Sequence, residues 1–270
     1  MLNFLRADLY RLRRSGVAIG LVLFILGLVV FIVGLSWGTA LAAGGDISMP
    51  GSYLGESALA STADNGFVSG YLPLLSAYAS TYLIASDWKS RGCKSLLSVP
   101  GARGRYLASK FAVAALLAVA MPAVMFISFA VVPVPFGLAY TTPIDVAETL
   151  GWWGLAALVC FGYAAVCTCV AVLSGNETLA WVSTMFVGLG IIGNGLNAGL
   201  WLVGFLAPTL ADAMQTAAGC LLVVQSTLVG LGAGALTAPA AELVRAVAVS
   251  LGWTAASAFV GWLAFRRRAL

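Results

Sequence analysis

The side chains that most often carry out chemistry in proteins are scarce in this sequence. It contains no histidine, which excludes Ser-His and Cys-His catalytic pairs, histidine-ligated zinc and haem with a histidine axial ligand. No two of the five cysteines form a CxxC pair, and Cys167 and Cys169 would point to nearly opposite faces of a helix. The cysteines are therefore interpreted as small buried hydrophobic residues, and neither a catalytic nor a metal site is expected.

The sequence also contains few lysines, and their positions show whether this chain could bind the phosphates of ATP. A phosphate-binding loop needs Gly-Lys-Ser or Gly-Lys-Thr. The only lysines are Lys89, Lys94 and Lys110, and none of them follows a glycine. We therefore expect no cofactor in this chain. If the protein uses ATP, then ATP and magnesium must be held by a partner subunit.

The overall composition indicates what must position these few polar groups. Hydrophobic residues make up 61% of the 270 residues, charged residues make up 9%, and the mean hydropathy is +1.00. Soluble domains usually carry about 25% charged residues, whereas a helix that crosses a bilayer needs about 20 apolar residues. Charge-free runs of that length predict an all-α polytopic membrane protein with one domain over 1–270. The six transmembrane helices are expected at about 17–37, 66–86, 111–133, 150–173, 179–206 and 246–265.

The distribution of the basic residues predicts how the six spans are oriented in the membrane. With six spans, 13 of the 14 Lys and Arg residues fall on one side, and Arg245 is the exception. Basic residues collect on the cytoplasmic side of membrane proteins, so both termini are expected to be cytoplasmic. The outer connections instead collect most of the acidic residues: Asp46, Glu56, Asp64, Asp145, Glu148, Asp212 and Glu242. The net charge of +4 is too modest to suggest a nucleic-acid partner.

Two segments outside the six spans have specific interpretations. Leucines at helical spacing within 1–16 predict a helix that lies in the headgroup layer, with an unstructured basic flank as the alternative. A cleavable signal peptide is disfavoured there because the apolar run is too long. Residues 213–236 are also charge-free, but a seventh span would place the C-terminal arginines outside. We therefore expect an outer re-entrant or interfacial element within 207–242.

The spacing of residues in the second span predicts a helix with two opposed faces. Ser69, Ser76 and Ser80 fall on one helical stripe, where small hydroxyl residues pack against another helix. The other side carries tyrosines, which either line a translocation path or anchor the span at the membrane interface. In the fifth span two amides either join that path or hydrogen-bond between helices. The path candidates are Tyr71, Tyr78, Tyr82, Asn194 and Asn197.

The connection after the second span is long enough to contain a helix of its own, at 87–100. Asp87, Arg91 and Lys94 share a stripe that we expect to face the cytoplasm. The adjacent stripe carries Trp88, Gly92 and Leu96, and Pro100-Gly101 ends the helix. Binding of lipid headgroups is the plainer alternative for this basic segment.

These residues carry a resemblance to a known family. The chain resembles the six-span membrane subunit of type-2 ABC exporters, through the basic N-terminal run Phe4-Leu5-Arg6-Ala7-Asp8-Leu9-Tyr10-Arg11-Leu12 and the segment after the second span. There, Asp87 is followed by Arg91-Gly92-Cys93-Lys94-Ser95-Leu96-Leu97 and by Gly101-Ala102-Arg103-Gly104-Arg105-Tyr106 with Lys110. Cys93 and Ala102 depart from the commoner residues at their positions.

The resemblance implies a function and a set of partners. It implies that 87–100 is a coupling helix that docks on a separate ABC ATPase (nucleotide-binding) subunit, through Asp87, Trp88, Arg91, Gly92, Lys94 and Leu96. It also implies a second permease copy or a homologous permease beside this one, in contact with membrane lipid. The expected activity is export of a peptide or amphiphilic compound across a bacterial cell membrane, without enzyme activity in this chain. A non-transporting scaffold or sensor and a secondary transporter are the alternatives; the latter usually places ionisable residues within its spans, and none occurs in the six expected here.

Overall fold

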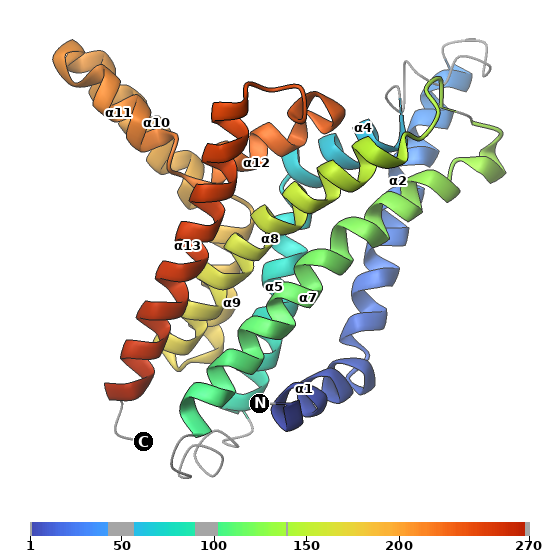
Figure 1. Ribbon diagram of the computed structural model, residues 1–270. Helices are drawn as coiled ribbons and strands as arrows, with labels where there is room; N and C mark the ends of the chain where they lie inside the picture. Colours follow the sequence, from blue (N-terminus) through green and yellow to red (C-terminus); the bar gives the residue numbers. More distant parts are fainter. Residues whose placement is uncertain (1, 43–56, 90–101, 139, 268–270) are drawn as a thin grey trace.

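A computed structural model describes residues 2–42, 57–89, 102–138 and 140–267, and all of the regular structure in these residues is helical. The prediction of an all-α membrane protein is therefore confirmed. The long helices form one bundle (Figure 1), which comprises α2 (Val17–Ala42), α5 (Tyr71–Lys89), α7 (Ala102–Val131), α8 (Val146–Ser174) and α13 (Ala240–Arg267).

Helix α8 is the centre of the bundle. It packs against α5, α7 and α13, and also against α9 (Glu177–Gly188). In its most apolar stretch 72% of the residues are buried, compared with 22% in α2 and 17% in α13. The side chain of Trp152 illustrates this enclosure, since it is fully buried and donates a hydrogen bond to the carbonyl of Val229 at 2.9 Å. Helices α2 and α13 therefore lie at the periphery of the protein.

The described residues contain four to six helical segments that are long and apolar enough to cross a membrane. Helices α2, α7, α8 and α13 meet this condition singly. Two bent pairs raise the number to six: α9 with α10 (Ile191–Leu206), and the segment Pro208–Ala218 with α12 (Leu222–Gly230). Helix α5, the expected second span, is less apolar because of its serines, threonine and tyrosines, yet it runs through the bundle beside α8 (Figure 1).

Several helix boundaries differ from those expected. The second span, expected at 66–86, corresponds mainly to α5, which begins after Gly70 and continues to Lys89. Helix α4 (Ala58–Ala63) and the π-helical turn η1 (Asp64–Val68) precede it. The third span, expected at 111–133, is the helix α7, which begins at Ala102 and therefore includes Lys110.

The fifth span, expected as one helix over 179–206, is bent by 52° between α9 and α10. Two glycines explain the bend. A Cβ atom at Gly188 would lie 2.9 Å from the Cα of Leu74, so only glycine permits this close approach of α9 to α5. Gly190 has a φ of +71°, a left-handed conformation that favours glycine.

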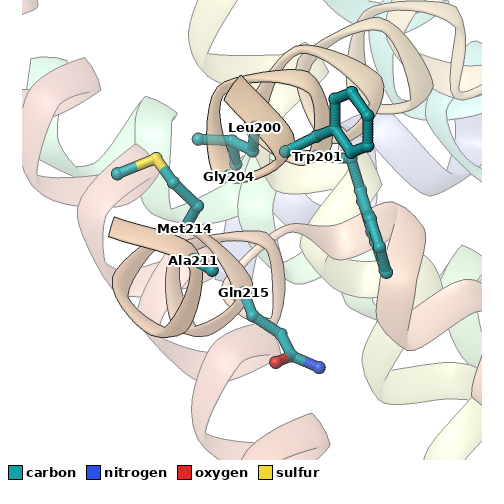
Figure 2. A pocket seen from close by; sticks show the side chains of 7 residues that line it. Leu200, Trp201, Gly204, Ala211, Met214 and Gln215 are labelled. Atoms are coloured by element: carbon teal, nitrogen blue, oxygen red, sulfur yellow. The ribbon is translucent and has the colours of Figure 1, made fainter. Parts of the chain in front are cut away.

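The region at 207–242 contains short helices. After η3 (Pro208–Leu210), α11 (Ala211–Ala218) runs beside α10, and the two extend away from the bundle (Figure 1). They enclose a small apolar cavity of about 190 Å³ that Gln215 borders (Figure 2). Helix α12 then returns to pack on α8 and η1, and η4 (Gly232–Ala235) precedes α13. The bend of 69° between the first segment and α12 is typical of a broken span or of a re-entrant loop, and the re-entrant interpretation stays a prediction.

Helix α1 (Leu2–Arg14) lies across one end of the bundle (Figure 1), where an interfacial helix was expected at 1–16. Its Leu12 is buried in the main hydrophobic core. The C-terminal ends of α5 and α13 and the start of α7 lie at the same end, which we call the basic end (Figure 1). The starts of α8 and α13, with Asp145 and Glu242, lie at the opposite, acidic end.

Candidate functional site

Four ionised side chains meet inside the basic end and form what we call the charge cluster: Asp8, Arg11, Asp87 and Lys110. The Nζ atom of Lys110 lies between two carboxylates, 2.7 Å from Oδ1 of Asp8 and 2.8 Å from Oδ2 of Asp87. Arg11 donates a hydrogen bond to the other oxygen of Asp87. The cluster therefore joins three helices that are far apart in the sequence, α1, α5 and α7.

Hydroxyl groups on α7 complete the coordination of the two carboxylates. Tyr106 donates a hydrogen bond to Oδ2 of Asp87 at 2.8 Å, and Ser109 donates one to Oδ2 of Asp8 at 3.1 Å. The ammonium group of Lys110 also lies 4.8 Å from the centre of the Tyr106 ring, a distance at which the ring face attracts a cation. The two acids thus receive donors on both oxygens.

The cluster is shielded from solvent and balanced in charge. Asp8, Asp87 and Lys110 are only 5%, 3% and 2% exposed, and Arg11 closes the cluster from the outside. Burial lowers the pKa of Arg11, but its hydrogen bond to Asp87 and the charges of Asp87 and Asp8 outweigh burial and raise that pKa above its ordinary value. With two anions and two cations the cluster is neutral as a unit, which is the condition under which charges tolerate burial.

The residues expected in a coupling helix at 87–100 are placed only in part. Asp87 and Trp88 belong to the last turn of α5. The expectation that Asp87 faces the cytoplasm on a charged stripe is wrong for this residue, because its carboxylate turns inward to α1 and α7. Trp88 is half-buried against the apolar residues that hold the ends of α5, α7 and α13 together. Arg91, Gly92, Lys94 and Leu96 lie outside the described residues.

A second candidate site lies between α2, α5 and α9, and we call it the apolar groove. It has a volume of about 420 Å³ and is lined by Val17, Gly20, Leu21, Phe24, Tyr71, Leu74, Leu75, Tyr78 and Met185. Two of the three tyrosines proposed for a translocation path therefore border one cavity. The third, Tyr82, lies one helical turn from Tyr78 on the same face of α5 and contacts Trp181 with ring centres 6.3 Å apart.

The two asparagines proposed for the same path do not line this groove. Asn194 and Asn197 lie on α10, beyond the bend that follows α9. Asn194 is exposed, and Oδ1 of Asn197 is buried without a hydrogen-bond partner among the described residues. The structure thus groups the tyrosines with Trp181 and Met185 rather than with the amides.

Asp8, Arg11 and Lys110 of the charge cluster were not predicted as site residues from the sequence, and neither were Glu177, which pairs with Lys89, and Trp181, which contacts Tyr82 beside the groove. A usable signal was present for the acids. Only three acidic residues fall on the basic side of the predicted topology, namely Asp8, Asp87 and Glu177, and each of them forms an ion pair. Acids retained among so many basic residues are candidates for defined pairs. Trp181 carries no comparable signal, because its role depends on the register between α5 and α9.

Together, the helical bundle, its apolar spans and the ordered charges at one end define a polytopic membrane protein. Comparison with protein families gives the class a name: the model of the ABC-2 family of transporter proteins matches residues 5–191, so the chain belongs to that family. The match runs from α1 to the start of α10 and includes both the charge cluster and the apolar groove. The resemblance to type-2 ABC permeases is therefore confirmed. The family is a membrane transport component and is not itself catalytic. A search of curated proteins finds no match.

Proposed function

We propose that this chain is the permease subunit of an ATP-driven exporter that moves a peptide or an amphiphilic compound. A separate ATPase subunit binds at the basic end, which faces the cytoplasm, and a second permease copy or a homologue completes the membrane unit. The observation that carries the proposal is the charge cluster, which ties α1 to the ends of α5 and α7. These two ends flank the segment 90–101, where we place the docking of the ATPase.

The energetics of the cluster favour a role in transmission over a role in stability. Burying ions is costly, and a buried ion pair often contributes no net stability relative to an apolar replacement. Separating the charges, however, would leave a buried ion without its partner, which is costly. The cluster therefore tends to move as a unit. A displacement of the end of α5 or of α7 is therefore passed to α1 through Asp87, Lys110 and Asp8.

The path from α1 leads directly to the apolar groove. Only Ser15 and Gly16 separate α1 from α2, and Gly16 has a φ of +70°, which fixes a sharp turn between them. Val17, Gly20 and Leu21 at the start of α2 form one wall of the groove. A movement of α1 would therefore shift this wall relative to α5 and α9, and an amphiphile bound in the groove would respond to the state of the ATPase.

The test is association with an ATPase encoded beside the permease. Arg91→Ala and Lys94→Ala are expected to reduce co-purification of the ATPase and to abolish transport, while membrane insertion is retained. Arg267→Ala is the matched control, since it removes a basic residue at the same end but outside the docking segment. If all three variants lose transport equally, or if no ATPase associates with the wild-type chain, the proposal is wrong and a scaffold or sensor is favoured.

A further inference from the structure

One continuous strip of side chains runs along the contact between α5 and α9. On α5, Tyr71, Tyr78, Tyr82 and Lys89 recur at helical spacing and share a face. On α9, Glu177, Trp181 and Met185 follow at intervals of four residues. The strip begins as the wall of the apolar groove and ends with charged residues at the basic end.

The middle of this strip is a half-buried aromatic cluster of three rings. The ring centres of Tyr78 and Trp181 are 4.7 Å apart at an angle of 36°, and those of Tyr82 and Trp181 are 6.3 Å apart at 44°. All three residues are partly exposed, and Tyr78 is also part of the groove lining. Aromatic faces attract cations through their quadrupoles, most strongly in tryptophan, and they attract quaternary ammonium groups in particular.

A carboxylate adjoins the aromatic cluster and is weakly engaged. Glu177 lies one helical turn before Trp181, and its Oε1 is 3.4 Å from Nζ of Lys89. The side chains of Lys89 and Glu177 are 73% and 36% exposed, so the pair is open to solvent. Exposed pairs of this kind contribute little, and a bound cation can therefore replace Lys89 beside Glu177.

We infer that this strip binds a cationic amphiphile: the apolar groove takes its hydrocarbon chain, and the aromatic cluster with Glu177 takes its quaternary or primary ammonium group. The inference rests on the proposed function, because it names the class of compound that the exporter takes from the membrane. The strip is complementary to a positive charge in particular. The three rings and the carboxylate all favour a positive group, while the described residues that line the groove include no ionised side chain.

The experiment measures binding to the permease alone, in nanodiscs of zwitterionic lipid, with empty nanodiscs as the correction for partitioning. The probes are dodecyltrimethylammonium and dodecyldimethylamine N-oxide at pH 8, which share chain and shape but differ in net charge. The cationic probe is expected to bind at least about tenfold more tightly. Equal affinities for the two probes would overturn the inference.

Variants then assign the binding to the strip. Trp181→Leu keeps an apolar side chain but removes the ring that contacts both tyrosines, so it is expected to weaken the cationic probe about tenfold. Trp201→Leu, which removes an exposed tryptophan on α10, is the matched control. Melting temperatures that equal that of the wild type establish folding. If Trp181→Leu binds both probes as the wild type does, the site is elsewhere and the inference is wrong.

Two substitutions at the charged end of the strip are expected to change the affinity for the cationic probe in opposite directions. Glu177→Gln is expected to weaken the cationic probe about threefold, and Lys89→Met, which frees the carboxylate, is expected to tighten it by about as much. Changes in the same direction for both variants would show that Glu177 does not receive the cation. Because no ATPase is present, binding survives a failure of the proposed partnership. Conversely, ATPase-dependent transport with no preference for cations would refute this inference alone.

Discussion

The charge cluster and the strip along the contact of α5 with α9, which we call the aromatic strip, lie on opposite faces of the same helix, α5, and they are built on opposite principles. On one face Asp87 is 3% exposed, and its partners come from two other helices. On the other face the tyrosines are half-exposed beside an open groove. Strong, buried pairing suits a part that transmits a displacement without deforming. Weak, apolar contacts suit a part that must bind and release a compound.

The largest effect is expected from breaking the charge cluster at its centre. Lys110→Met leaves the buried carboxylates of Asp8 and Asp87 without their shared cation. Removing one partner of a buried ion pair costs about 3–5 kcal/mol, so the melting temperature of the detergent-solubilised protein should fall steeply. Adding Asp8→Asn and Asp87→Asn removes the uncompensated charges and should restore much of the loss. A Lys110→Met protein that melts with the wild type would show that the cluster is not a unit.

The next largest loss of stability is expected on the groove side of α5, where close packing holds α5 and α9 together. Gly188→Ala adds a methyl group 2.9 Å from the Cα of Leu74, so the two helices must separate. Overpacking of this kind costs about 1–3 kcal/mol. Gly199→Ala is the matched control, because among the described residues no neighbouring element comes within 4 Å of a Cβ there, and it should be neutral or slightly stabilising. Thermal unfolding measured side by side distinguishes the two, and equal melting temperatures would contradict the close contact.

A third variant tests whether the groove is open space that the protein uses. Gly20 lines the groove, and a Cβ built there meets no atom of another described part of the chain within 4 Å. Gly20→Leu should therefore fold normally, with a gain of up to about 1 kcal/mol from helix propensity, while binding and transport of the amphiphile fall because the side chain fills the cavity. Gly27→Leu, at an equally open position of α2 outside the groove lining, is the control. Unchanged transport by Gly20→Leu would remove the groove from the path.

The two faces of α5 also show what could be predicted from the sequence. The helical period separates the serines from the tyrosines, and Ser76 and Ser80 are indeed buried while the tyrosines are half-exposed. The position of Asp87 was mispredicted because the span was ended at residue 86. Helix α5 continues to Lys89, and its period places Asp87 seven residues after Ser80, on the same buried face.

Other features depend on contacts that no local pattern specifies. The bend after α9 follows from the distance between Gly188 and Leu74, and the pairing of Lys110 with Asp8 joins residues 102 positions apart in the sequence. Charge-free runs find helices in a membrane protein well, because the bilayer demands them. They carry no information on which helices touch, and both candidate sites are built from contacts between helices.

The smallest effect on stability is expected at the pair of Lys89 and Glu177, which forms the charged end of the aromatic strip. This pair joins α5 to α9 at the basic end, but Lys89 is mostly exposed and the distance is 3.4 Å. Solvent screens such a pair, and its contribution is at most about 0–1 kcal/mol. Lys89→Met should therefore leave the melting temperature within error of the wild type, in contrast to Lys110→Met on the same membrane side. A large loss of stability in Lys89→Met would show that charge pairing also holds the aromatic strip together, and the contrast between the two faces of α5 would fail.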